Sequence, residues 1–256
     1  MTHLSPSAVP VKDRVVLITG GTSGIGRAAA LRMAAEGARV MVSSRRQSAV
    51  DDTLAELAPL APPGHFAGTT CDVADPTAVH ALVDHTLERF GRLDIVVHSA
   101  GMLRLGDSGL RMLANIHPEE MHAVINTNVK GTFYINRAAA RVMMDQGGGV
   151  IINIASILGR IARSFTSVYC ASKFAMIGLT ESFAEEMHPY GIRVMAVLPD
   201  AVKTPFWESD GPQSATSFAL EPSRVADLIH DLATLPPSLL IDPIILSPFR
   251  TDPPSD

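Results

Sequence analysis

A phenol and an ammonium group stand one helical turn apart in the segment SVYCASKFAMIG, residues 167–178. Residues at positions i and i+4 share one face of a helix, so Lys173 is expected beside Tyr169. A free phenol has a pKa of about 10 and is a weak acid–base catalyst at neutral pH, but a neighbouring ammonium favours the phenolate and lowers that pKa. The pair therefore predicts a tyrosine that exchanges protons with a substrate, with Lys173 as its activator.

A serine hydroxyl is placed to assist such a proton exchange. Ser156 lies thirteen residues before Tyr169, after the apolar run 149–155. Open α/β sheets bind their ligands at the carboxyl ends of strands, so this hydroxyl could hold a substrate oxygen. Taken singly, a helical Tyr or Lys usually packs or is solvated, and a serine after a strand usually caps a turn. The catalytic interpretation depends on the three residues acting together.

Three glycines in LITGGTSGIGRAAA close a predicted strand and open a predicted helix. Because Gly20, Gly24 and Gly26 lack a Cβ, phosphate oxygens could approach the backbone N–H groups and the positive end of the helix dipole. A tight turn without a ligand is the alternative, since glycines also serve packing alone. The strand–turn–helix context favours a dinucleotide site.

The end of the second predicted strand, VMVSSRRQ, carries no acidic residue. Folds that prefer NAD place a carboxylate here, which accepts hydrogen bonds from the adenosine ribose and repels a 2'-phosphate. This chain has Ser43 and Ser44, followed by Arg45 and Arg46. Two guanidinium groups can bind a phosphate dianion, so NADP(H) is favoured and NAD(H) stays possible. One or both arginines could instead be solvated on a loop.

Short apolar runs alternate with segments of helical period, which is the arrangement needed to position these residues. The predicted strands cover residues 14–20, 38–44, 65–73, 93–101, 149–156, 192–199 and 239–246. The predicted helices cover residues 24–37, 47–60, 77–90, 118–144 and 168–190, with another from about 221. This pattern predicts an α/β fold: one Rossmann-like, doubly wound parallel sheet of about seven strands with helices on both faces.

We expect residues 1–256 to form one dinucleotide-binding and catalytic domain, as the length allows. Residues 1–12 and 248–256 are expected to be tails, and residues 200–220 a substrate loop. An irregular segment of that length is often a lid.

In chain order, these motifs resemble the short-chain dehydrogenase/reductase family over nearly the whole length. TGGTSGIG is similar to its TGxxxGxG turn, CDV (Asp72 and Val73) to its adenine-contacting pair, and NTNVKG to the helix with its catalytic Asn, here Asn128. INIASI and YCASK match its Ser and YxxxK motifs. The resemblance implies that Tyr169 is the acid/base, Lys173 also binds the nicotinamide ribose, Ser156 polarises the substrate, and Asn128 anchors a water of the proton relay.

The predicted site follows from the motifs and this resemblance together. The predicted catalytic residues are Asn128, Ser156, Tyr169 and Lys173. The predicted cofactor-binding residues are Gly20, Thr22, Ser23, Gly24, Ile25, Gly26, Ser44, Arg45, Arg46, Asp72, Val73, Ser99, Ala100, Gly101, Tyr169, Lys173, Pro199, Val202 and Thr204. The resemblance also implies a homotetramer, or a homodimer, with helices 118–144 and 168–190 forming an intersubunit bundle.

Three departures from the family pattern bear on the site. HSAG, residues 98–101, replaces the family's NNAG, and we expect His98 to be structural rather than catalytic. PDAVKT places Asp200 where the family has glycine, which adds a carboxylate near the nicotinamide; the turn is expected to persist because Asp tolerates unusual backbone angles. The segment between Gly101 and Asn128 is a few residues longer than usual and is expected to reshape the pocket rim.

Aromatic residues gather on the predicted substrate loop. Phe206, Trp207 and Phe218, together with Leu158, indicate an apolar substrate pocket under a lid, although they could equally pack against a partner subunit.

Composition narrows the partners. A net charge of −5 and a pI of about 6.0 favour neither nucleic acid nor anionic lipid, and no apolar run is long enough to span a membrane. Two cysteines without metal-ligand spacing predict no disulfide framework and no metal, and with the lack of a signal peptide they favour the cytoplasm.

The function predicted from the sequence is an NADP(H)-dependent oxidoreductase, an alcohol dehydrogenase or carbonyl reductase. It would transfer hydride between the nicotinamide and a small to medium secondary alcohol or ketone. Two alternatives stay open. One is a cofactor-sensing regulator without turnover, and the other is a lyase or epimerase that uses bound nicotinamide as a transient hydride store. The identity of the substrate, the physiological direction and the stereochemistry do not follow from the sequence.

Overall fold

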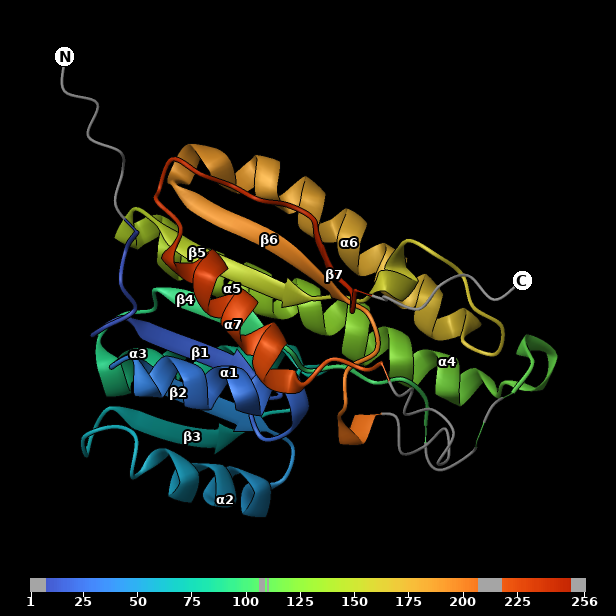
Figure 1. Ribbon diagram of the computed structural model, residues 1–256, viewed down its shortest axis with the longest axis horizontal. Helices are drawn as coiled ribbons and strands as arrows, with labels where there is room; N and C mark the ends of the chain where they lie inside the picture. The colour runs from blue at the N-terminus through green and yellow to red at the C-terminus, as the bar shows by residue number, and fades with distance from the viewer. Residues whose placement is uncertain (1–7, 106–108, 110, 207–217, 250–256) are drawn as a thin grey trace.

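One seven-stranded parallel sheet organises the computed structural model, which describes residues 8–105, 109, 111–206 and 218–249 (Figure 1). The strand order is β3-β2-β1-β4-β5-β6-β7, and every adjacent pair is parallel. The strands are β1 (Val15–Thr19), β2 (Arg39–Ser44), β3 (Phe66–Thr70), β4 (Ile95–His98), β5 (Gly149–Ile154), β6 (Ile192–Pro199) and β7 (Ile244–Leu246). The predicted fold class is confirmed.

Helices cover both faces of this sheet, as near-continuous apolar strands require. One face carries α1 (Gly24–Ala35), α2 (Gln47–Leu57) and α7 (Pro222–Thr234). The other carries α3 (Pro76–Phe90), α5 (Gly131–Gln146) and α6 (Ser167–Met187). Alternate residues of each strand enter the two cores: Val16 and Ile18 pack under the first set of helices, and Val15 and Leu17 under the second.

The strand order reverses direction between β1 and β4, since the chain builds outward to β3 and then returns to the other side of β1. Such a switch point leaves a crevice at the carboxyl ends of the strands, where open α/β sheets bind ligands. All the motifs identified in the sequence follow or flank strand ends on this edge.

The helix predicted over residues 118–144 is interrupted at the motif that it carries. It consists of α4 (Pro118–Ile125), a π-helical turn η2 (Asn126–Lys130) and α5. A π turn widens the backbone by one residue and is common at functional sites. Gly131, which follows this turn, allows close packing, because a Cβ there would lie 2.9 Å from Cγ2 of Val73.

The chain ends and the substrate loop differ in part from the sequence prediction. Residues 1–7, 207–217 and 250–256 lie outside the described residues. Within the predicted tail 1–12, Val11 is buried in the core and the N–H of Val9 donates to the carbonyl of Thr234. The last strand is shorter than predicted, because only residues 244–246 pair with β6.

Both described ends of the predicted substrate loop are held together. Val202 and Leu220 form an isolated parallel bridge, and the N–H of Lys203 donates to the carbonyl of Leu220 at 2.9 Å. Trp207 lies outside the described residues, whereas Phe206 and Phe218 are described. None of the described helices is long and apolar enough to cross a membrane.

Candidate active site

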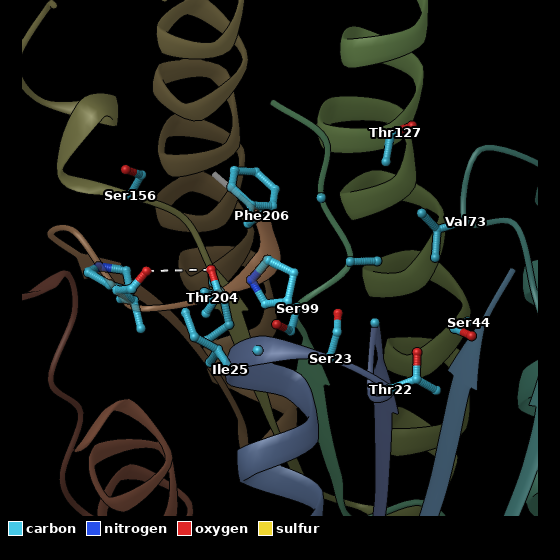
Figure 2. Close-up of a pocket in the computed structure, with 18 of the residues that line it drawn as sticks. Thr22, Ser23, Ile25, Ser44, Val73, Ser99, Thr127, Ser156, Thr204 and Phe206 are labelled. Atoms are coloured by element: carbon cyan, nitrogen blue, oxygen red, sulfur yellow. Dashed lines mark hydrogen bonds between the residues drawn. The ribbon is translucent and has the colours of Figure 1, made fainter. Parts of the chain in front are cut away.

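A cavity of about 580 Å³ opens at the carboxyl edge of the sheet (Figure 2). Nearly all of the predicted site residues line it: Gly20, Thr22, Ser23, Gly24, Ile25, Ser44, Arg45, Arg46, Asp72, Val73, Ser99, Ala100, Gly101, Ser156, Tyr169, Lys173, Pro199, Val202 and Thr204. Gly26 and Asn128 do not line it. In Figure 2, Ser156, Thr204 and Phe206 lie at one end of the cavity, and Ser44 and Val73 at the other.

The glycine turn forms the floor of the cavity, and its backbone is closely packed. Gly20 has a φ of +63°, and a Cβ there would lie 2.8 Å from Cα of Ala100. A Cβ at Gly26 would overlap the carbonyl oxygen of Gly20. The turn therefore needs glycine at both positions, and it presents the N-terminus of α1, where the helix dipole and unpaired N–H groups attract anions.

The end of the cavity at β2 is polar and open to solvent. Arg45 and Arg46 are exposed, and neither guanidinium forms an ion pair with a described residue. Asp72 is exposed beside them, and its Oδ1 accepts a hydrogen bond from the N–H of Ala74 at 3.0 Å. No acidic residue lies at the end of β2 itself, which leaves this end of the cavity with two nearby positive charges.

Tyr169 and Lys173 lie in the first turns of α6, where the cavity is buried. The Nζ of Lys173 lies 5.6 Å from the centroid of the Tyr169 ring and donates to the carbonyl of Ile154 at 2.9 Å. Burial raises the pKa of Tyr169, although a hydrogen bond with Ser156 opposes this. Burial also lowers the pKa of Lys173 to about 7.

These directions differ from the sequence prediction that Lys173 lowers the pKa of Tyr169. The physical reason is that both groups are desolvated together, and removal from water disfavours the phenolate and the ammonium alike. In the protein alone, the tyrosine is therefore a neutral phenol at pH 7.

Ser156 follows β5 and caps a short 3₁₀ turn, η3 (Ile157–Gly159). Its Oγ accepts a hydrogen bond from the N–H of Leu158 at 3.1 Å. The capping role that a serine often has after a strand is therefore present here, and the same hydroxyl lines the cavity. Capping fixes the oxygen and leaves its hydrogen free to donate.

Asn128 lies in the π turn, and its side chain is fully engaged with the protein. Its Nδ2 donates to the carbonyl of Met102 at 2.8 Å and to the Oγ of Ser172 at 2.9 Å, and its Oδ1 accepts from the N–H of Met102 at 2.7 Å. Both amide hydrogens are thereby used. The side chain ties the segment after β4 to α6, and the water-anchoring role implied by the family resemblance stays a prediction.

Comparison with known proteins identifies the family. Residues 14–215 match the family model described as short chain dehydrogenase. The chain belongs to this family. The short-chain dehydrogenases are oxidoreductases that use nicotinamide cofactors, and this chain is an oxidoreductase of that kind.

Individual relatives support the assignment. The chain is 36% identical over 213 residues to levodione reductase of Leifsonia aquatica, covering 83% of this chain and 78% of that protein. It is 37% identical over 194 residues to 3alpha-hydroxysteroid dehydrogenase of Mediterraneibacter gnavus, covering 76% of each. The structure of an actinorhodin polyketide ketoreductase variant with NADPH matches with a TM-score of 0.82 at 30% identity, covering 92% of this chain and 96% of that one.

Two departures of this short-chain dehydrogenase from the family pattern are resolved by the geometry. Among the described residues other than glycine, positive φ angles occur at Asp13 and Phe165 only, so Asp200 needs no unusual backbone conformation. Its Oδ1 accepts a hydrogen bond from the N–H of Ala201 at 2.8 Å. His98 is fully buried at the end of β4, and its Nδ1 lies 2.7 Å from the Oγ1 of Thr19.

Several residues that line the cavity were missed or given no site role from the sequence. These are Cys71, Thr127, Ile154, Ala155 and Pro205, whereas Phe206, which the sequence predicted for the substrate pocket, also lines the cavity. Most are chain neighbours of predicted residues, so adjacency was the available signal. Thr127 lies in the π turn, and regular helical spacing does not predict which side chains of such a turn face the cavity. The Cys71 thiol stays protonated at neutral pH, because burial and the nearby carboxylates raise its pKa to about 12.

An apolar wall encloses the Tyr169 end of the cavity. Leu103, Leu158, Tyr169 and Cys170 form a buried cluster, against which Phe206 packs. The rings of Tyr169 and Phe206 have centroids 5.8 Å apart at 55°. Phe206 lines the cavity beside Tyr169, whereas Leu103 and Leu158 pack behind the lining.

Proposed function

We propose that this short-chain dehydrogenase is an NADP(H)-dependent carbonyl reductase or alcohol dehydrogenase with Tyr169 as its acid/base group. The observation that carries the proposal is the continuity of one cavity. Arg45 lines it at one end, the glycine turn forms its floor, and Ser156, Tyr169 and Lys173 line the other end. A ligand extended through this space would bind its phosphates at α1 and present its other end to the tyrosine.

The residues present fit a dinucleotide. The N-terminus of α1 faces the cavity, its first turn carries no acidic residue, and the cap residue Ser23 makes no capping hydrogen bond with its side chain. Backbone N–H groups and a free hydroxyl are suitable donors for a pyrophosphate. Thr204 is pressed against the same turn, because a Cβ at Gly24 would lie 2.8 Å from its Cγ2.

The preference for NADP(H) rests on the end of the cavity at β2. Arg45 and Arg46 immediately precede or cap α2, whose first turn also lacks an acidic residue. Two exposed guanidiniums without a competing carboxylate at the strand end supply charge-assisted donors for a 2'-phosphate. NAD(H) would forgo these contacts, although its binding is not blocked by any of them.

A bound nicotinamide supplies a hydride to the carbonyl carbon, or accepts one in the reverse direction. For reduction, the neutral phenol of Tyr169 donates its proton to the carbonyl oxygen, and Ser156 donates a hydrogen bond to that oxygen. The raised pKa of Tyr169 keeps the proton-donating form populated at pH 7. When it is protonated, Lys173 places a positive charge 5.6 Å from the centroid of the Tyr169 ring, which would stabilise the phenolate left after proton transfer.

The substrate class follows from the apolar side chains that line the cavity near Tyr169. We assign a ketone or secondary alcohol whose substituents are largely hydrocarbon, because the side chains of Ile154, Pro205 and Phe206 carry no hydrogen-bonding group. The activities for which two relatives are named, levodione reductase and 3alpha-hydroxysteroid dehydrogenase, are compatible with this class.

We further propose a homotetramer, or a homodimer, assembled through α5 and α6. Phe133 on α5 and Phe174 on α6 are each 46% exposed in the isolated chain. Large apolar residues on two neighbouring helices would be buried by a four-helix contact with a second copy. Sedimentation analysis of the purified chain tests this, and a monomer at micromolar concentration would contradict it.

A panel of ketones incubated with NADPH or NADH tests the proposed activity. We expect stoichiometric loss of reduced-cofactor absorbance with at least one apolar ketone, and a lower dissociation constant for NADPH than for NADH. A regulator would bind the cofactor without consuming it, and a lyase or epimerase would convert substrate without net consumption. Either result would contradict the proposal.

A further inference from the structure

Four polar side chains form a row across the sheet, each in the last or next-to-last residue of its strand. The strand registers pair Ser43 with Thr19, Thr19 with His98, and His98 with Asn153. All four are buried, at 1% exposure or less. We call them the polar row.

The polar row faces the helices α3, α5 and α6. The residues two positions earlier on the four strands, Met41, Leu17, Val96 and Ile151, pack in the core beneath these helices. Alternate residues of a strand point to the same face, so the row extends this side of the sheet. The Nδ2 of Asn153 accordingly donates to the Oγ1 of Thr180 on α6 at 3.0 Å.

Hydrogen-bonding atoms in and above this row have no partner among the described residues. They are the Oγ of Ser43, the Nε2 of His98, the Oδ1 of Asn153, and both Nδ2 and Oδ1 of Asn136 on α5. Asn136 is itself buried, and its α5 neighbours Ile135 and Ala139 belong to the core on this face. Buried polar groups in proteins nearly always find a partner, and internal water supplies it where several converge.

The hydrogen bonds around Thr19 define the protonation of His98. The Oγ1 of Thr19 accepts from the N–H of Ala100 at 3.4 Å, so its own hydrogen can donate to the Nδ1 of His98 at 2.7 Å. The ring hydrogen is then on Nε2, which has no partner among the described residues, and His98 is the register neighbour of Asn153, whose Oδ1 also has none. Burial lowers the pKa of His98 to about 3, and the nearby charge of Lys173 contributes, so the ring is neutral.

This chain of contacts ends at the glycine turn. Thr19 bridges the His98 ring to Ala100, and Ala100 is the residue whose backbone would meet a Cβ on Gly20 at 2.8 Å. The N–H of Ser99 also donates to the carbonyl of Thr19 at 3.1 Å. A shift of the His98 ring would therefore move, through Thr19, the backbone of Ala100 against which Gly20 is packed.

We propose that His98 is a positioning residue: with Asn153 and Asn136 it holds internal water beneath the cavity, and through Thr19 it fixes Ala100 and the glycine turn for cofactor binding. The water and the tautomer are properties of the protein itself. Only the effect on cofactor affinity rests on the proposed function.

Two measurements on the unaltered protein test the first part. Nitrogen-15 NMR of the imidazole should show a hydrogen on Nε2, a bare Nδ1, and no titration between pH 5 and 9. A high-resolution crystal structure should show a water within hydrogen-bonding distance of Nε2 and of an amide group of Asn153 or Asn136. A ring that is protonated on Nδ1, that titrates, or whose Nε2 bonds directly to a protein group would overturn the proposal.

A mutant cycle tests the second part. Thr19→Val removes the bridging hydroxyl with little change in shape, and His98→Leu removes both ring nitrogens. Each should raise the NADPH dissociation constant about five- to tenfold, since each breaks the same link, and the double variant should be no weaker than the worse single variant. Turnover at saturating NADPH should change by less than about threefold, because the reacting groups are untouched.

His98→Asn separates positioning from folding. An amide at this position can accept from Thr19 and donate toward the water, so it should restore NADPH affinity and the melting temperature together. If His98→Leu and Thr19→Val fold and bind NADPH as well as the parent, or if their effects are additive, the link to the glycine turn is wrong. If all variants unfold except His98→Asn, its unchanged affinity and an Asn-bound water would still support the inference, and a weakened affinity would overturn it.

Discussion

The two ends of the cavity use charge in opposite ways. At the β2 end, Arg45, Arg46 and Asp72 are exposed, so solvent screens their charges and each contributes a modest, salt-dependent amount to binding. At the α6 end, Tyr169 and Lys173 are buried, and burial is the largest cause that moves both pKa values toward the uncharged forms. Loss of one charged side chain at the β2 end should therefore weaken cofactor binding only modestly. Loss of a single reacting atom at the α6 end should instead abolish most of the turnover.

The largest effect is expected from Tyr169→Phe. Losing the phenolic proton should reduce ketone reduction by about 100- to 10,000-fold while leaving NADPH affinity within about threefold. Tyr190→Phe is the matched control, because Tyr190 is 45% exposed and lies outside the cavity. Steady-state rates and cofactor titrations measure both. If Tyr169→Phe keeps its turnover, the α6 end does not supply the reacting proton, and the contrast between a binding end and a chemical end is wrong.

The double change Arg45→Ala with Arg46→Ala probes the exposed end. We expect the dissociation constant for NADPH to rise about 10- to 100-fold and that for NADH to stay within about twofold. The loss should shrink as salt is raised, since exposed charges are screened. Arg89→Ala at the last turn of α3 is the control for charge removal away from the cavity. Equal losses for both cofactors would show that the arginines do not read the 2'-phosphate.

Burial of Lys173 predicts a pH-dependent stability. A lysine in the unfolded chain keeps its proton up to a pKa of 10.5, whereas the buried one has a pKa of about 7. Between these values the unfolded state binds more protons, so stability rises with pH across this window. Lys173→Met should therefore melt about 2 to 4 °C higher than the parent at pH 7, an advantage that fades toward pH 10.5.

The control for this stability effect is Lys12→Met. Lys12 is exposed, so this variant should track the parent at every pH. If Lys173→Met instead melts below the parent at pH 7, its hydrogen bond to Ile154 outweighs the desolvation that we assign to it.

The smallest effect is expected from Asp200→Gly. Asp200 lines the α6 end of the cavity, and its carboxylate should disfavour substrates that carry a negative charge close to the carbonyl. The variant should raise kcat/KM for an anionic ketone by a few fold, about two- to fivefold, relative to a neutral ketone of the same shape. An unchanged ratio of kcat/KM for the two ketones would mean that the carboxylate only accepts the hydrogen bond from Ala201 and does not affect the substrate.

Much of the fold could be predicted from the sequence because its signals are local. Short sequence patterns predict local structure by themselves. Examples are the apolar runs of β1 and β4, which predict strands, and the glycines of the first turn, which predict a turn. The same holds for Tyr169 and Lys173, whose proximity follows from helical spacing. The parallel sheet then follows from the alternation of predicted strands and helices along the chain.

What could not be predicted depends on residues far apart in the chain. The desolvation that reverses the expected pKa of Tyr169 comes from packing by Leu103, Leu158 and Phe206. The engagement of the Asn128 side chain depends on Met102 and Ser172, and the π turn around it has no periodic signature in a single sequence. Val11 entered the core although its neighbourhood is rich in Pro and Ser.

The bridge between Val202 and Leu220 has a practical meaning for engineering. The bridge holds the two ends of the substrate segment next to each other. The positions of β6 and α7 should therefore depend little on the length or sequence of the segment between them. Sequences exchanged between Phe206 and Leu220 should alter the substrate range while Thr204 and the rest of the proposed cofactor site stay in place.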